Sequence, residues 1–500
     1  MRDGTELPTD IYLPDPSARN LPCILLRSPG GRAARIATPF AYMAKHQYVV
    51  AIQDTRCALD QTGKTLPYCT DGWGYFQDGY DTIEWLANSD FTNGKIGTLG
   101  ASALGITQLM LAPTAPPALK CQYIGMAAAN LYQDAIYSGG QFLKHQVEGW
   151  LGLHARDPEV LQYVCNNNSY NCFWKGLDTT QVPNRVSVPA IFYTGWYDVF
   201  SQGTLDAFMC RNEHGAKGAR GKQKIVIGPW PHSWPLTKKL GDFDIPASAQ
   251  APLVEYFPER WFNFHLKDEA NGVDLLPPVT YYVMGPFDNT PSKGNVWKTA
   301  ENWPIPSHLI YFYLTQDHSL SMAPQASEAS LSYLYDPKQP TPTIGGRNLF
   351  LESGPKDQTP MEQRSDLIMF TSPPLEEDLE VTGRIIAKLF FSSDKPDTDV
   401  AVRLTDVYPD GRSILIVDNL TRLGSLATFA PDKPCEVEVD LWSTSIVFAK
   451  GHSIRVSISS SNYPKYERNL NGSTTPEVAR NTVFFGGKKA SAILLPVVKE

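Results

Sequence analysis

A serine placed among small residues is the first feature of this sequence that suggests chemistry. Ser102 lies in the run GASALG between Gly100 and Gly105, with a strand-like segment before it and a helical segment after it. This arrangement is typical of a nucleophile elbow, where a strained turn raises a serine hydroxyl above a sheet and only small neighbours avoid collision. The backbone N–H of Ala103, at the start of the helix, is the expected oxyanion donor.

A serine hydroxyl is a weak nucleophile at neutral pH and needs a histidine base that an acid holds in place. Two later segments supply these groups in the order Ser, Asp, His that is typical of α/β-hydrolases. Asp198 follows the apolar run VPAIFYT, and His232 follows the run QKIVI. We predict that Ser102, Asp198 and His232 form a catalytic triad at the carboxyl edge of a parallel sheet. A turn-forming aspartate and a structural histidine are the competing interpretations of the last two residues.

The elements around these residues indicate an α/β fold followed by an all-β part. Strand-like and helical runs alternate over the first third of the chain, which predicts a parallel sheet with helices on both faces. The following stretch is rich in aromatic and amide residues and lacks a strand rhythm, so we interpret it as an inserted helical cap. Short β-branched runs separated by Pro, Gly, Asp and Asn then predict a β-sandwich or jelly roll. The predicted division is an α/β-hydrolase domain over 1–112 and 187–272, a cap over 113–186 and a jelly-roll domain over 273–500.

The composition excludes several other classes of protein. The net charge is −8, and no basic run alternates with aromatic residues, so we expect neither a nucleic-acid nor a membrane partner. The first residues carry charges and no apolar core, which argues against a signal peptide and favours a cytoplasmic protein. The eight cysteines are scattered, so the sequence indicates neither a zinc site nor a disulfide framework. We expect a small-molecule substrate, and a homodimer remains open.

Ordered motifs along nearly the whole chain resemble one family. They include the opening segment from Met1 to Pro14, the motif QDTR that ends at Arg56, the segment DGYDTIEW, the serine elbow, GWYD, GPWPHS and, in the β region, DVYPDGR and SSSNYP. The sequence resembles the cocaine-esterase-like and X-prolyl dipeptidyl aminopeptidase group of serine hydrolases. The resemblance implies the three domains above and the triad at Ser102, Asp198 and His232. It also implies cleavage of esters, amides or X-Pro peptides through an acyl-enzyme, with no metal or organic cofactor. In the QDTR motif we interpret Asp54 and Arg56 as mainly structural, tying loops beneath the site.

The sequence departs from this family at the oxyanion site. Members usually carry a tyrosine in an Arg-x-Pro-Tyr pattern, whose hydroxyl is the second oxyanion donor, and here Gly30 and Gly31 follow Pro29. Losing one such donor typically costs on the order of 10²–10³ in turnover. Three outcomes are open: the backbone N–H of Gly30 or Gly31 replaces the phenol, another tyrosine such as Tyr42 or one from the cap reaches in, or the chemistry is no longer plain hydrolysis.

Aromatic residues near the triad and in the cap are the candidates for a substrate pocket, and packing residues are the alternative interpretation. They favour a hydrophobic or aryl acyl group, and no persuasive acidic cluster is present to bind a free peptide amino terminus. The best prediction is therefore an esterase or acylase. A biosynthetic acyltransferase or non-hydrolytic catalyst, an X-Pro dipeptidyl aminopeptidase and a catalytically silent binding protein remain as alternatives. The candidate pocket residues are Trp196, Tyr197, Trp230, Tyr132, Tyr137 and Phe142, with Leu131 and Trp150 as further cap candidates.

Overall fold

A nine-stranded sheet is the centre of the first 300 residues. The structure is a computed structural model that describes residues 1–233, 238–250, 253–288 and 290–499. The strand order is β1-β3-β2-β4-β5-β6-β7-β10-β11, and only the edge strands β1 and β11 run antiparallel to their neighbours. The strands are β1 (Thr9–Tyr12), β2 (Leu21–Ser28), β3 (Val49–Asp54), β4 (Thr92–Ala101), β5 (Leu119–Gly125), β6 (Ala190–Tyr197), β7 (Lys224–Pro231), β10 (Val279–Val283) and β11 (Val296–Ala300).

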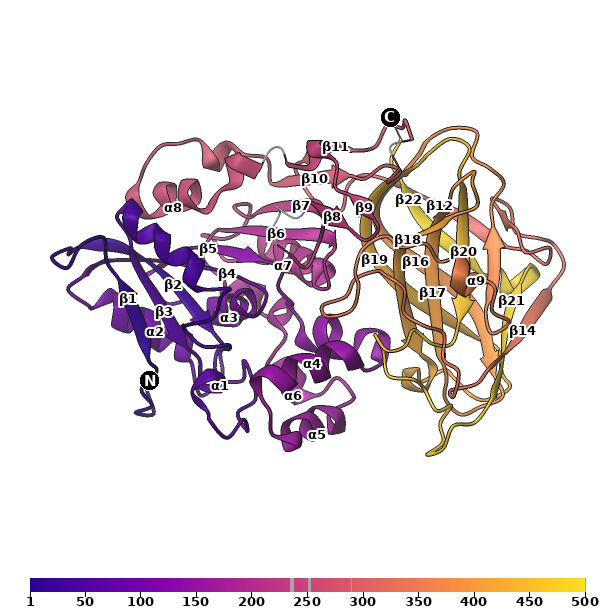
Figure 1. Ribbon diagram of the computed structural model, residues 1–500, viewed down its shortest axis with the longest axis horizontal. Coiled ribbons are helices and arrows are strands. Elements are labelled where there is room, and N and C mark those ends of the chain that lie inside the picture. Colours follow the sequence, from indigo (N-terminus) through magenta and orange to yellow (C-terminus); the bar gives the residue numbers. More distant parts are fainter. Residues whose placement is uncertain (234–237, 251–252, 289, 500) are drawn as a thin grey trace.

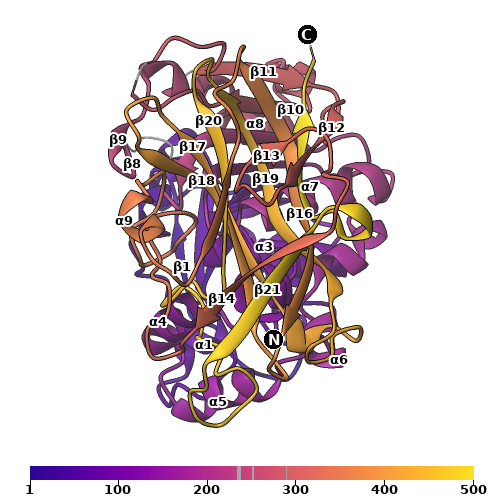
Figure 2. The same ribbon diagram turned by 90° about the vertical axis from the view of Figure 1, so that its right-hand side faces the viewer.

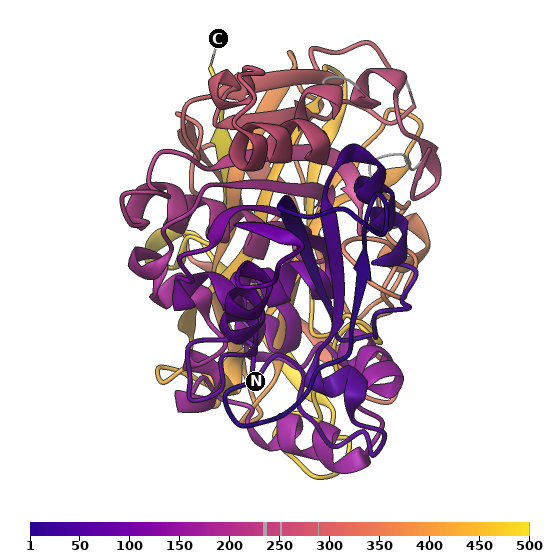
Figure 3. The ribbon, with the colours of Figure 1, turned by 90° about the vertical axis from the view of Figure 1, so that its left-hand side faces the viewer.

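Helices cover both faces of this sheet (Figures 1 and 3). Side chains alternate between the faces, so Ile24 and Leu26 of β2 join one apolar cluster while Cys23 and Leu25 join another. The first cluster packs against η1 (Thr38–His46) and α8 (Pro258–Lys267), and the opposite face packs against α2 (Asp78–Ala87), α3 (Ala103–Leu111) and α7 (Ser201–His214). The smaller elements of this part are α1 (Arg56–Leu59), η2 (Ala112–Thr114), η7 (Ala247–Gln250), η8 (Leu253–Tyr256), η9 (Val273–Leu275) and the hairpin of β8 (Lys239–Leu240) and β9 (Phe243–Asp244).

The predicted cap exists, but the structure places its start later than residue 113. Residues 119–125 form β5, a central strand of the sheet between β4 and β6. Its polar side chain Gln122 is fully buried and exchanges hydrogen bonds with Thr98, the backbone of Gln108 and Arg211. A strand whose buried polar groups are satisfied by side chains lacks the apolar pattern on which the prediction depended. The cap elements are η3 (Leu131–Ile136), η4 (Ser138–Gly140), α4 (Lys144–His154), α5 (Pro158–Asn166), α6 (Cys172–Lys175), η5 (Thr179–Gln181) and η6 (Pro183–Arg185).

The all-β part begins later than predicted as well. The run 279–284 was expected in the sandwich, yet β10 pairs in parallel with β7 and extends the central sheet. A short β-branched run indicates that a strand forms but not which sheet it joins, because the central sheet and the sandwich favour the same residue types. Met284, just after β10, forms a parallel bridge with Ile446 and so links this sheet to the sandwich.

The C-terminal part is a sandwich of two antiparallel sheets (Figures 1 and 2). Its core is continuous with that of the catalytic part, since one apolar cluster includes Leu109, Phe142, Trp196 and Val437. One sheet contains β12 (His308–Leu314), β13 (Leu320–Ser321), β14 (Ala329–Tyr335), β16 (Leu379–Ser393), β19 (Cys435–Phe448), β21 (Ala479–Phe485) and β22 (Ala492–Val497). The other contains β15 (Ile368–Thr371), β17 (Asp399–Val407), β18 (Ser413–Arg422) and β20 (Ser453–Ser459); α9 (Thr359–Glu362), η10 (Leu423–Ser425) and η11 (Gly487–Lys489) lie in the connections.

Within the described ranges, none of the helices combines the length and the apolar character that a bilayer span requires. The α/β-hydrolase fold with an inserted helical cap and a C-terminal β-sandwich agrees with the predicted fold class.

Candidate active site

Ser102 lies on a strained turn between β4 and α3. Its backbone has φ 57° and ψ −126°, a conformation that non-glycine residues rarely adopt. The flanking glycines are required by space: a Cβ on Gly105 would lie 2.7 Å from the carbonyl oxygen of Gly125, and one on Gly100 would lie 2.5 Å from the Cβ of Leu104. The local sequence therefore forms the predicted elbow.

The three predicted catalytic side chains form one hydrogen-bonded series. His232 Nε2 lies 2.9 Å from Ser102 Oγ, and His232 Nδ1 lies 2.6 Å from Asp198 Oδ1. Each residue leaves the carboxyl end of a parallel strand: β4 for the serine, β6 for the aspartate and β7 for the histidine. With Nδ1 protonated toward the carboxylate, the unprotonated Nε2 is positioned to accept the serine proton.

Asp198 is fully buried and is held by two further donors. The hydroxyl of Thr194 donates to Oδ2 at 2.6 Å, and the backbone N–H of Phe200 donates to Oδ1 at 3.1 Å. These bonds fix the direction of the carboxylate. The Phe200 ring meets the ring of His232 edge to face, with 5.4 Å between centroids, and restricts the rotation of the imidazole.

Two backbone N–H groups are free to serve an oxyanion. Those of Ala103 and Gly30 have no hydrogen-bond acceptor in the described part of the chain, whereas that of Gly31 donates to Ser28 O at 3.2 Å. In the register of β2 with β4, Leu25 pairs with Thr98. If that register is continued for four residues, Pro29, next to Gly30, comes opposite Ser102. The geometry thus favours Gly30 over Gly31 as the second backbone donor.

The Gly30 loop is fixed by the ion pairs of Arg32 with Asp54 and Asp10 and by close packing. Arg32 donates its backbone N–H to Asp54 Oδ1 at 2.5 Å and its guanidinium to Asp54 Oδ2 at 2.6 Å. A Cβ on residue 30 would lie 3.1 Å from His154 Cε1, so the imidazole of His154 covers the glycine closely. Burial lowers the pKa of His154, which keeps its ring neutral at neutral pH. Asp54 thus holds the backbone of this loop.

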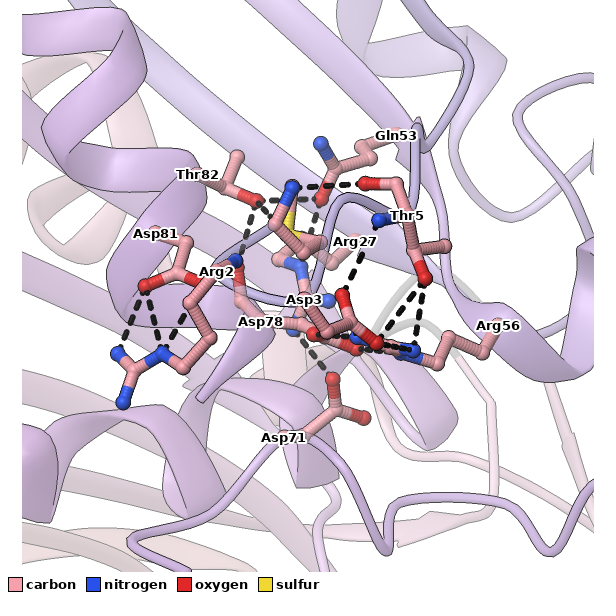
Figure 4. Close-up of polar contacts among 11 residues, drawn as sticks. Arg2, Asp3, Thr5, Arg27, Gln53, Arg56, Asp71, Asp78, Asp81 and Thr82 are labelled. Atoms are coloured by element: carbon pink, nitrogen blue, oxygen red, sulfur yellow. Dashed lines mark hydrogen bonds and ion pairs between the residues drawn. The ribbon is translucent and has the colours of Figure 1, made fainter. Parts of the chain in front are cut away.

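Arg56, the other charged residue of the QDTR motif, belongs to a separate network (Figure 4). Its guanidinium binds Asp78 Oδ2 at 2.7 Å and Asp3 Oδ2 at 2.7 Å, and so joins the start of α2 to the N-terminal segment. Beside it, Arg27 on β2 binds Asp71 Oδ1 at 2.5 Å, with both side chains almost fully buried. These contacts support the structural interpretation of the motif.

An apolar cavity of about 90 Å³ opens at Ser102. No charged side chain of the described residues lines it, and its polar groups are those of Ser102, Tyr68, Cys69 and Gln146. Burial raises the pKa of Tyr68 well above its usual value, so its phenol stays neutral. The apolar walls are Leu66, Pro67, Ala103, Ile106, Leu131, Ala135, Ile136, Val147, Trp150, Leu151, Val164, Phe173, Trp174, Leu177, Phe200 and Leu349.

The six side chains predicted for the pocket do not line this cavity. The Trp230 ring folds back over Gly228 of its own strand β7, where a Cβ would collide with it. Trp196 Nε1 donates to Tyr282 O, and the Tyr197 hydroxyl donates to Leu415 O, at the boundary with the sandwich. Tyr132, Tyr137 and Phe142 form a cap core behind Leu131 and Trp174, with both tyrosine hydroxyls bonded to backbone carbonyls of Asn168 and Val164. The interpretation of these residues as packing residues fits their positions better.

Other cavity residues carried no signal in the sequence. Tyr68 and Cys69 come from the irregular loop between α1 and α2, and Leu349 comes from the long connection between β14 and β15, which joins the two sheets of the sandwich. Tyr68 has φ 67°, an unusual backbone for an aromatic residue, and its ring stacks on Trp150 with 5.7 Å between centroids. Its hydroxyl has no hydrogen-bond partner among the described residues. The tyrosine alternative from the sequence, Tyr42, instead donates its hydroxyl to Glu259 on α8.

The fold and the geometry of this site define the class of protein, a serine hydrolase with an α/β-hydrolase fold. Residues 3–159 and 150–234 match the X-Pro dipeptidyl-peptidase (S15) family, and residues 271–494 match the X-Pro dipeptidyl-peptidase C-terminal non-catalytic domain. Cocaine esterase from Rhodococcus sp. (strain MB1 Bresler) is 30% identical over 580 aligned residues, which cover 100% of this chain and 97% of the esterase. The chain belongs to this family of cocaine-esterase-like, S15-type serine hydrolases.

Solved structures support the same fold over the whole chain. An aminopeptidase from a marine sediment Thaumarchaeota archaeon superposes with a TM-score of 0.84 at 22% identity, covering 100% of this chain and 95% of that one. An α-amino acid ester hydrolase superposes with a TM-score of 0.81 at 23% identity, with the same coverage. At these identities the similarity is one of fold.

Proposed function

We propose that the protein cleaves an ester or amide of a bulky hydrophobic acyl group through an acyl-enzyme on Ser102. The observation that carries this proposal is the series from Ser102 through His232 to Asp198, which opens into a cavity without charged walls. A hydroxyl paired with an oriented imidazole suits attack on a carbonyl carbon. An apolar cavity beside it suits the hydrocarbon part of an acyl group.

In the proposed mechanism, His232 accepts the proton of Ser102 as the oxygen attacks the acyl carbonyl. Asp198 stabilises the imidazolium that results, and the N–H groups of Ala103 and Gly30 hold the oxyanion of the tetrahedral intermediate. The imidazolium then donates its proton to the leaving alcohol or amine. A water molecule, activated by the same imidazole, attacks the acyl-enzyme carbonyl and regenerates the serine hydroxyl.

The cavity chemistry favours uncharged acyl groups over α-amino acyl groups and X-Pro peptides. An ammonium group bound in an apolar site needs a carboxylate or several acceptors to offset its loss of hydration. No Asp or Glu of the described residues lines the cavity. An aminopeptidase and an amino acid ester hydrolase share the fold, but for this reason we do not propose a peptide or an amino acid ester as the substrate of this protein.

Intact-mass spectrometry during turnover tests this proposal. The panel contains p-nitrophenyl acetate, butyrate, phenylacetate and benzoate, an amino acid p-nitrophenyl ester and an Ala-Pro p-nitroanilide, each with and without an added alcohol or amine acceptor. We expect an acyl adduct and faster turnover with butyrate or the aryl esters. Ser102→Ala should abolish the adduct, while the exposed Ser17→Ala should leave it unchanged.

The result that rejects the proposal is a well-folded native protein that forms no adduct with any ester and does not react with a fluorophosphonate at Ser102. A preference for the Ala-Pro anilide would assign the peptidase activity instead. Product formation that requires the acceptor would assign acyl transfer.

A further inference from the structure

Two small chambers lie where the cap meets the sandwich, behind the acyl cavity. Each has a volume of about 10 Å³, room for one particle of about the size of a water molecule. Leu143, Arg347 and Lys465 line both of them. Ser138, Val199, Asp418, Asn419, Trp442 and Tyr466 complete the first chamber, and His145, Gln146, Asn348, Leu349, Phe350 and Leu351 complete the second.

The charged side chains around the chambers do not balance. Arg347, Lys465 and the adjacent Arg403 are each at most 7% exposed, and Asp418 is the buried carboxylate that faces them. Both oxygens of Asp418 lie 3.1 Å from Lys465 Nζ. Arg403 binds only neutral oxygens, the hydroxyl of Ser459 and the carbonyl of Ser461. Asp366, Glu362 and Asp440 also act on Arg403 or Arg347 through their charges, but each is ion-paired with another arginine. Asp418 is therefore the carboxylate that the three buried cations share without a competing arginine partner.

Arg347 also has an unused hydrogen-bond donor. Its Nη2 donates to the carbonyl oxygens of Asp418 and Leu441, while its Nη1 is buried and has no partner in the described part of the chain. The guanidinium lies over the ring of Trp442, 4.8 Å from its centroid. Trp442 itself has φ 68°, a strained backbone that holds the ring beneath the cation.

An unpaired buried charge is strongly destabilising, and it is usually compensated by a counter-ion or by loss of the charge. Burial lowers the pKa of Lys465, although Asp418 opposes this effect. A guanidinium does not lose its proton in proteins, so Arg347 still requires a negative partner. An anion beside Arg347 Nη1 and Lys465 Nζ would supply both the missing charge and the missing acceptor.

We propose that these chambers form a structural binding site for one small monovalent anion of the halide class, held by Arg347 and Lys465. The small volume, about that of one water molecule, excludes sulfate and phosphate. Because the chambers join the cap to strands β18 and β19, the bound anion stabilises the cap against the sandwich.

Thermal unfolding of the full-length protein in chloride-free buffer tests the site. Sodium chloride or bromide is titrated against sodium gluconate at constant ionic strength. We expect a saturable rise of a few degrees in Tm with either halide, because an anion that binds only the folded chain stabilises it by mass action. We also expect an anomalous bromide peak beside Arg347 in crystals soaked in bromide.

Arg347→Met should abolish the halide dependence of Tm, whereas Arg412→Met, at an exposed ion pair, should retain it. If Arg347→Met does not fold, the crystals of the native protein decide: a bromide peak beside Arg347 supports the site, and its absence overturns the proposal. Equal Tm values in halide and gluconate with no peak would overturn the proposal and assign the chambers to water. A halide response that persists in folded Arg347→Met would place the binding elsewhere and would overturn it as well.

Discussion

The hydrogen bond from Thr194 to Asp198 can be removed while the carboxylate itself stays in place, so a Thr194 variant tests how much the orientation of Asp198 matters. The Thr194 hydroxyl donates to the carboxylate oxygen that does not face His232. In Thr194→Val this donor is lost, so we expect kcat to fall about tenfold with little change in KM, as is typical for a group that acts on the base in the transition state. Steady-state kinetics on the preferred ester checks this, and Thr194→Ser should restore most of kcat. Equal defects in the serine and valine variants would contradict a positioning role.

The backbone N–H of Gly30 and the hydroxyl of Tyr68 are the two candidates for the second oxyanion donor. If the N–H of Gly30 serves, Tyr68→Phe keeps kcat within about threefold of the native value, since no donor to the oxyanion is removed. If the Tyr68 hydroxyl serves, the same variant loses on the order of 10² to 10³ in kcat. Single-turnover acylation rates distinguish these outcomes, and thermal unfolding confirms that the variant is folded.

The contact of His154 with Gly30 gives a second test of the loop. In Gly30→Ala the new Cβ would lie 3.1 Å from His154 Cε1, closer than ordinary contact, so the loop or the imidazole must move by a few tenths of an ångström. We expect about a tenfold loss of kcat and partial recovery in the double variant Gly30→Ala, His154→Ala, because contacting residues are not additive. Additive losses in the double-mutant cycle would show that the loop does not respond to this contact.

At the scale of elements, the seam between the cap and β17 contains a buried acid. Asp399 accepts hydrogen bonds from Gln141 of the cap at 2.9 Å and from Asn469 at 2.8 Å. Burial raises the pKa of Asp399 to about 7 from its ordinary value of 3.8. The folded protein therefore retains this proton where the unfolded chain has lost it, and stability falls as pH rises from about 4 to about 7, then levels off.

Urea unfolding of the native protein and Asp399→Asn between pH 4 and pH 8 checks this dependence. The asparagine cannot ionise, so we expect the free energy of unfolding of the variant to decline less over this range. The difference between the two proteins should change by no more than a few kcal/mol and should be constant above pH 8. Parallel curves for the two proteins would contradict the assignment.

The sequence predicted the elements that carry the triad better than those around them. Ser102, Asp198 and His232 each follow a strongly apolar strand. The features that identify them, such as the small neighbours of Ser102 at the elbow, lie within a few residues in the sequence. Strand β5 was missed because Gln122 is buried by partners from three other elements. The cavity walls were missed because Tyr68 and Leu349 reach the site through long-range packing, which leaves no periodic pattern in the sequence.

At the scale of the whole molecule, three separate parts of the chain form the apolar cavity at Ser102. Leu349, from the connection between β14 and β15, lines the cavity together with residues of the cap helix α4, and the neighbouring Phe350 ring lies against Gly149 of that helix. In Leu349→Ala we expect kcat/KM for longer acyl chains to rise relative to acetate by up to about tenfold, because added methylenes are worth about 1–3 kcal/mol in such pockets. Leu309→Ala, exposed on β12, is the matched control. An unchanged acyl-chain profile in the Leu349 variant would exclude this wall from the substrate site.

The wall at Leu349 also bears on how such enzymes diverge. The segment that bears it lies more than 100 residues beyond His232 and belongs to a part of the chain that carries none of the reacting groups. Mutations there can alter which compounds are consumed while the proton relay is inherited intact. The range of accepted compounds can thus diverge within one lineage through changes in the connection between β14 and β15.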